Sequence, residues 1–207
     1  MERKIDYSNI SVPFLLFFTN LDNIENNLNK IKFSLDITKD LLECNPDLIK
    51  DFDKLYESDG DNDLDERIEQ TKNITINQYY ILLISYFEEF LNILQFDITQ
   101  ENNDVDSLSF SDIFKMRWRN KYKYDFICKL LGMEIVDKIE NYHELRNAIA
   151  HNFKIKANFI NKLKKYLDNN NKVILNNELF ENLLLELFNL SNEINDIAIN
   201  KYPFLKL

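Results

Sequence analysis

The sequence predicts an all-α protein built as a bundle of long helices. Its 207 residues include only two glycines and three prolines, so residues that break helices are rare. Leucine and isoleucine recur every three or four positions over long stretches, which is the spacing of an amphipathic helix. Hydrophobic residues make up 45% and aromatic residues 13% of the chain, a composition that excludes disorder and allows a real core.

We expect one domain over residues 1–207. Within it, residues 1–70 form an N-terminal helical extension, residues 75–153 form the core that carries the functional motif, and residues 154–207 form C-terminal helices. No internal repeat divides the chain further.

The first helix is predicted to begin at Thr19, which forms a capping pattern with Asp22. Its inner face is given by apolar residues at alternating spacings of three and four, interrupted once by Thr38: Leu21, Ile24, Leu28, Ile31, Leu35 and Leu42. Pro46 then restarts the chain at a first helical position. Another apolar stripe follows over residues 48–56, and residues 57–66 form an acidic loop.

A central helix is predicted from Thr75 to about Phe96, because its apolar face is wide. Residues 97–108 are polar and acidic and are predicted to be a loop. Ser111 then opens a helix, and Gly132 ends a short one that follows Asp125.

Three further elements complete the chain. A helix from about Glu134 to His151 carries the functional motif, and a helix over residues 157–167 follows it. Residues 168–171 form a turn, and a last long helix runs from Asn177 to about Lys201. Its inner face consists of leucines and isoleucines at helical spacing: Leu179, Leu183, Leu187, Leu190, Ile194 and Ile197.

Charge is distributed unevenly along the chain. The net charge is −10, yet residues 115–165 hold 13 Lys and Arg against 5 Asp and Glu, a local net charge of +8. Local charge sets the potential that an RNA strand meets, so this block is a candidate RNA-binding region. The candidate residues for contact with RNA are the cations of the aromatic-rich stretch around Trp118 and two lysines after residue 151: Lys115, Arg117, Arg119, Lys121, Lys123, Lys154 and Lys156. The alternative is that the stretch around Trp118 is an amphipathic helix whose cations lie in solvent and whose Trp118 packs in the core.

Other patterns indicate the compartment. Cys44 and Cys128 are far apart and form no metal-binding spacing, which favours free thiols in a reducing cytoplasm. No stretch reaches the length of a membrane span, and the apolar run over residues 12–18 lacks a cleavage site. We therefore expect a cytoplasmic protein without a membrane-spanning segment.

The most informative segment is Arg146-Asn147-Ala148-Ile149-Ala150-His151. The only histidines of the chain, His143 and His151, lie within nine residues of each other, inside one predicted helix. Imidazole suits proton transfer near neutral pH, and guanidinium offers a planar fork of donors to phosphate oxygens. An imidazole that transfers protons, next to a guanidinium that binds phosphate, can together cleave RNA without a metal ion.

Residues 142–152 resemble the signature of the HEPN superfamily, in which an arginine, a polar residue, three less constrained positions and a histidine close an α-helix. The resemblance implies a HEPN-like helical bundle acting as a metal-independent endoribonuclease without a cofactor, in a toxin or an antiphage defence system. It assigns catalytic roles to Arg146, Asn147 and His151. Residues 85–91 also look like the family's second helix, with Glu88 or Glu89 holding Arg146 or His151. His143 lies outside the family pattern and is a supporting candidate.

On an ideal helix, Arg146 and His151 point about 140 degrees apart, so one straight helix does not aim both at one phosphate. Either the helix ends before His151, or two copies of the helix face each other. The resemblance implies the second, a homodimer with the site at the subunit interface.

Other interpretations remain open. His151 could cap the helix, and Arg146 could pair with a carboxylate such as Glu140. The chain could be a non-catalytic helical module that binds RNA or a protein, or the inert half of a toxin–antitoxin pair that needs a cognate partner.

Overall fold

The computed structural model describes residue 5, residues 8–45, residue 48 and residues 64–101, 130–151, 154–174 and 176–207. These residues form helices and no strand, which confirms the all-α class; the only β pairing among them consists of two isolated bridges. In chain order the elements are α1 (Val12–Cys44), α3 (Leu64–Glu101), α6 (Met133–His151), α7 (Ala157–Ile160), η2 (Lys164–Tyr166), α8 (Asn177–Lys201) and η3 (Pro203–Leu205). The acidic loop up to residue 63, the basic stretch over 115–123 and the helix expected after Ser111 lie outside the described residues.

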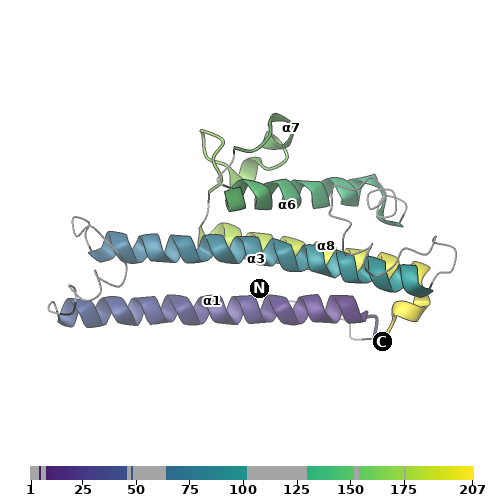
Figure 1. Ribbon diagram of the computed structural model, residues 1–207, viewed down its shortest axis with the longest axis horizontal. Coiled ribbons are helices and arrows are strands. Elements are labelled where there is room, and N and C mark those ends of the chain that lie inside the picture. Colours follow the sequence, from purple (N-terminus) through teal and green to yellow (C-terminus); the bar gives the residue numbers. More distant parts are fainter. Residues whose placement is uncertain are drawn as a thin grey trace.

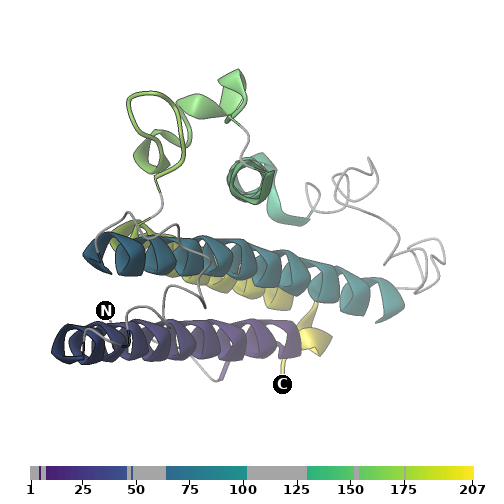
Figure 2. The same ribbon diagram turned by 60° about the vertical axis from the view of Figure 1, so that its left-hand side comes forward.

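The long helices form the base of the molecule. Figure 1 shows α1 and α3 lying side by side, with α8 packed along them, and both α3 and α8 contact α1. Helix α6 lies on the other side of α3 from α1 (Figure 1). In Figure 2, α6 is viewed end-on while α1 and α3 still run across the view, so α6 crosses them rather than following them.

Helix α1 begins seven residues before the predicted start at Thr19. Ser11 is its N-cap, and the Ser11 hydroxyl accepts a hydrogen bond from the backbone N–H of Phe14. Asn195 of α8 stabilises this start, because its Oδ1 accepts bonds from the Ser11 backbone N–H (3.1 Å) and hydroxyl (2.7 Å). The apolar run over residues 12–18 is therefore part of α1, and Phe14 and Phe17 are buried in the core.

Helix α3 also extends beyond its predicted ends. It begins at Leu64 rather than Thr75, and it continues to Glu101 through residues that were expected to form a loop. Contacts with α1 hold the early turns, since Asp65 pairs with Lys39 and Lys72 pairs with Asp36, both at 2.7 Å. Apolar residues of both helices pack there as a second small core: Leu35, Leu42 and Ile68, with Ile31 against them. At the other end, Ile98 is fully buried.

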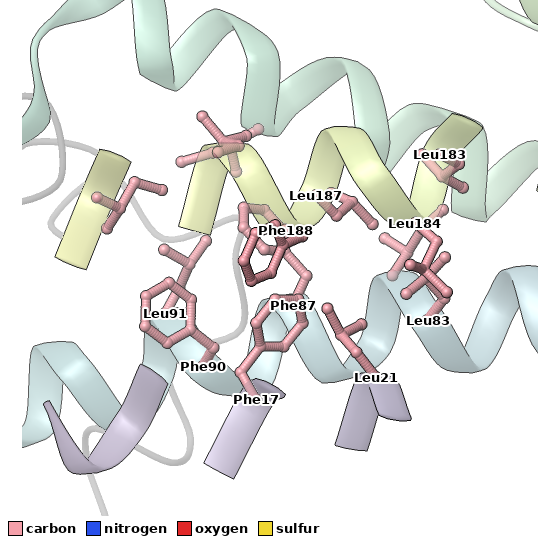
Figure 3. Close-up of a cluster of buried hydrophobic side chains, with 14 of the residues drawn as sticks. Phe17, Leu21, Leu83, Phe87, Phe90, Leu91, Leu183, Leu184, Leu187 and Phe188 are labelled. Carbon is pink, nitrogen blue, oxygen red and sulfur yellow. The ribbon is translucent and has the colours of Figure 1, made fainter. Parts of the chain in front are cut away.

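The main core lies where α1, α3 and α8 meet. Figure 3 shows Phe17 of α1, Phe87 and Phe90 of α3 and Phe188 of α8 gathered in it with leucines of the same helices. The Phe17 ring lies 5.9 Å from Phe87 and 5.6 Å from Phe90, centroid to centroid. Helix α6 joins this core because Tyr142 meets the edge of Phe87 at 6.4 Å.

The C-terminal third agrees with the sequence in part. Gly132 adopts φ +80°, a left-handed conformation that suits glycine, and it separates the helical residues Leu130 and Leu131 from α6. The helix expected over 157–167 is instead the short α7 followed by the 3-10 turn η2. The turn over residues 168–171 is confirmed, with Asn171 at φ 60°, and α8 spans the predicted residues. None of the described helices has the length and apolar character needed to cross a membrane.

Candidate functional site

Helix α6 carries the motif, and its apolar side packs on the core as predicted. Ile135, Ile139 and Leu145 are buried, while Tyr142 and Ile149 are half-buried against the core. The helix ends at His151, so the first of the two geometric solutions, an end before His151, is wrong. The other solution, a second copy of the helix that faces the first, stays a prediction.

Three consecutive residues of α6, just before Arg146, each bond to a different part of the fold. Tyr142 reaches Glu186 of α8, His143 reaches Glu88 of α3, and Glu144 reaches Lys156 in the segment after the helix. Each interaction joins a carboxylate to a donor. Together these contacts fix the position and rotation of α6 about one turn before Arg146. A site whose side chains must keep a set geometry depends on such contacts around it.

The first of these contacts is a carboxylate shared by two phenols. Glu186 Oε2 accepts hydrogen bonds from the hydroxyls of Tyr142 (3.0 Å) and Tyr166 (2.8 Å), and Lys165 pairs with the other oxygen. Burial, followed by the negative charge of Glu186, raises the pKa of both tyrosines above the ordinary range. Both phenols therefore stay protonated and continue to donate, which ties α6 and η2 to α8.

The second contact pairs a histidine with a carboxylate. The Nδ1 atom of His143 lies 2.7 Å from Oε1 of Glu88, and both side chains are largely buried, at 23% and 14% exposed. The sequence left open whether Glu88 or Glu89 faces α6. Glu88 does, and it holds His143 rather than Arg146 or His151. Glu89 is exposed and lies on the α1 side of α3, beside Pro13 and Leu16.

The third contact involves Glu144, which is buried although it is charged. One Glu144 oxygen accepts the backbone N–H of Lys156 (3.2 Å) and the other pairs with the Lys156 ammonium (2.6 Å). This bond folds the chain back after His151, and Ile155 is buried beside it. Lys156, a candidate RNA contact, is paired with Glu144, and 69% of its side chain is exposed. Sequence reasoning missed Glu144, because a partner twelve residues away leaves no local pattern.

We predict that Glu144→Ala lowers the free energy of unfolding by about 1–3 kcal/mol, since it removes the acceptor of a buried hydrogen bond and a charge partner. Hydrogen exchange at the Lys156 amide should become faster. Glu134→Ala is the matched control on the same helix, because Glu134 is 87% exposed and its pair with Lys138 is a surface pair. Equal losses of stability in denaturant titrations of the two variants would contradict this account of Glu144.

Arg146 and Asn147 are linked to each other. Both are half-buried, and Nη1 of Arg146 donates to Oδ1 of Asn147 at 3.3 Å. Nε of Arg146 is buried and has no hydrogen-bond acceptor among the described residues. Asn147 lies one turn before His151 on the same side of α6, so the bond directs the guanidinium toward the side that carries Asn147 and His151. The guanidinium is bonded to Asn147 rather than to Glu140, the carboxylate that sequence reasoning had considered.

His151 is the last residue of α6, and its side chain is exposed. Lys154, three residues on, is exposed too, while Lys162 pairs with Asp137 at 3.2 Å. The other cations expected to bind RNA lie outside the described residues: Lys115, Arg117, Arg119, Lys121 and Lys123.

A cavity of about 210 Å³ lies between α1 and α8, where Glu25, Lys32 and Phe180 contribute to its walls. Within the part of the chain that the structure describes, no three side chains of the metal-ligating types are gathered.

In comparisons with known proteins, the chain matches no family model, no curated protein and no solved structure. The HEPN assignment therefore depends on residues 142–152 and stays a prediction.

Proposed function

We propose that this chain is a metal-independent endoribonuclease of HEPN type that works as a homodimer, in a toxin or antiphage defence setting. One observation supports this proposal above the others: the guanidinium of Arg146 bonds to Asn147 and so lies toward the same side of α6 as the exposed His151. In this proposal, the guanidinium of Arg146 binds phosphate on the same side of α6 as the imidazole of His151.

The proposed reaction needs only these groups. A base takes the proton of a ribose 2′-hydroxyl, whose oxygen attacks the adjacent phosphorus, and the bond from phosphorus to the 5′-oxygen breaks. An acid protonates that departing oxygen. Arg146 stabilises the added negative charge on the phosphoryl oxygens, and His151 supplies proton transfer. The products are a 2′,3′-cyclic phosphate and a 5′-hydroxyl end.

The same geometry supports the proposal of a homodimer. On an ideal helix Arg146 and His151 leave the axis about 140 degrees apart, and the bond from Arg146 reaches Asn147, not His151. A second α6 related by a two-fold axis places an arginine and a histidine from each subunit along one shared groove. In this arrangement the site is incomplete in a single subunit.

The test is to incubate the purified protein with mixed RNA in excess chelator, beside His151→Ala. We expect cleavage by the natural protein to persist and to leave cyclic phosphate ends, and the variant to lose about 10²–10⁴-fold of the rate, the usual effect of removing an acid/base group. Glu134→Ala, at the far exposed end of α6, serves as the control and should cleave normally.

Two outcomes would contradict the proposal in different ways. A requirement for added divalent metal would overturn the mechanism while leaving an RNA-cleaving enzyme. RNA retained on the protein without any cleavage would favour the non-catalytic binding module.

A further inference from the structure

A shallow groove of about 110 Å³ lies between α1 and α3, whereas α6 lies on the other side of α3. Its walls come from the first turns of α1 and the middle of α3 and include Leu16, Phe17, Tyr86, Glu89, Phe90 and Ile93. Phe17 and Phe90 are buried, but Leu16 is 49% exposed. Val12 and Leu82, each one turn before a residue of the groove, are exposed apolar residues too. Exposed apolar side chains gathered in this way mark a surface on which another segment packs.

The groove also carries a carboxylate without a counterion. Glu89 is exposed, and it forms no ion pair or hydrogen bond with any residue that the structure describes. Tyr86 and Ile93 lie three and four residues away on the same side of α3, so the carboxylate stands among apolar side chains. The chain outside residues 115–165 has a net charge of −18, because the total is −10 and that block contributes +8. The groove therefore suits an apolar segment that carries cations.

Residues 110–122 of the same chain have this composition. Residues 115–123 hold five cations and no acidic residue. On an ideal helix the apolar residues of the segment share one side with two of the cations: Phe110, Ile113, Phe114, Trp118, Arg117 and Lys121. The remaining cations, at intervals of four, lie on the opposite side: Lys115, Arg119 and Lys123. One side of the segment thus matches the groove in apolar character and complements it in charge.

The length of the chain allows the segment to reach the groove. Residues 102–129 lie outside the described residues, between the end of α3 and the start of α6. Helix α3 ends at Glu101, which is about 12 Å beyond Ile93 along the helix axis. Residues 102–110, fully extended, reach about 30 Å, which is enough to return along α3. Residues 123–129 reach about 23 Å, more than the helix diameter of about 10–12 Å that separates the groove from α6.

We propose that residues 110–122 dock in the groove between α1 and α3, with Trp118 packed against its apolar wall and a cation beside Glu89. The inference is independent of the proposed function. It chooses between the two interpretations of the stretch around Trp118, because the aromatic side of the segment packs on the bundle and stacks on no RNA base. The cations on the other side of the segment face solvent. They lie on the α1 side of α3, away from Arg146 and His151 on α6.

Fluorescence of the full chain tests the docking, because Trp118 is its only tryptophan. Trp118 emission should be shifted to the blue relative to free tryptophan in water and weakly quenched by acrylamide. Leu16→Asp, which puts a charge into the groove, should shift the emission to the red and raise the quenching constant several-fold. Phe33→Asp is the matched control: Phe33 is 66% exposed and lies about 25 Å farther along the same helix. It should leave both readings unchanged, and circular dichroism should show that both variants keep their helices.

Glu89→Lys tests the charge separately from the apolar contact. It places a cation opposite the cations of the segment, so the quenching of Trp118 should rise as it does in Leu16→Asp. Glu69→Lys is the control, because Glu69 is exposed on the same helix, about 30 Å from Glu89, and its reversal changes the net charge equally. Equal effects of the two variants would contradict a local role of Glu89.

Four results would overturn the docking. Trp118 could be fully exposed in the natural protein, or protected yet insensitive to both groove variants, which would place it elsewhere. Protection that is lost on dilution would mean that the segment of a second copy fills the groove. Quenching of Trp118 by added single-stranded RNA would mean that the ring stacks on bases. None of these readings uses RNA cleavage, so the docking and the nuclease proposal can each fail without the other.

Discussion

Arg146→Ala is expected to reduce the rate of RNA cleavage by about 10²–10³-fold, the usual loss when a donor to the developing charge of a transition state is removed. The loss should appear in kcat more than in KM, because the guanidinium is proposed to stabilise the phosphoryl oxygens most strongly when they carry added charge. Initial rates on a defined single-stranded RNA in chelator would measure it. Arg146→Lys should recover only part of the rate, since an ammonium keeps the charge and loses the planar fork.

The matched control for this prediction is Arg67→Ala. Arg67 is also a half-buried arginine, but it lies in the early turns of α3, near the small core made with α1 and away from α6. Both variants lose one guanidinium and one positive charge, so a general effect of charge would lower cleavage equally. Circular dichroism should show that both keep their helices. Full activity in folded Arg146→Ala would remove the central residue of the proposed site.

Phe87→Ala is expected to lower the free energy of unfolding by about 3–5 kcal/mol, the cost of removing a large buried ring and leaving a cavity. Phe87 is 1% exposed and contacts Phe17 of α1, Phe90 of its own helix and Tyr142 of α6. It therefore connects the core of the long helices to the helix that carries the motif. Urea titration followed by circular dichroism would measure the loss.

Leu82→Ala is the control for Phe87, because it lies on the same helix and is exposed. A surface substitution of this kind usually changes stability by less than about 0.5 kcal/mol. A similar loss in both variants would mean that Phe87 does not hold the position in the core that the structure assigns to it.

The helical class, the inner faces and the bounds of α6 and α8 could be predicted from the sequence, because they depend on local periodicity. The apolar residues of α8 at helical spacing are buried or packed against the core as predicted. The starts of α1 and α3 were predicted seven and eleven residues too late. Asn195 bonds Ser11 at the start of α1, and the early turns of α3 pack on α1 through Ile68, Leu35 and Leu42. Such contacts between distant residues leave no pattern in the surrounding sequence.

The motif itself is a local feature, so Arg146, Asn147 and His151 could be named from the sequence, together with the angle of about 140 degrees between the arginine and the histidine on an ideal helix. The partners of α6 could not be named, because Glu88, Lys156 and Glu186 come from other parts of the chain. Folding selects Glu88 over Glu89, pairs Lys156 with Glu144 and turns the guanidinium toward Asn147. Periodicity along a chain reports which face of a helix is buried, whereas the identity of the opposing side chain is a property of packing in three dimensions.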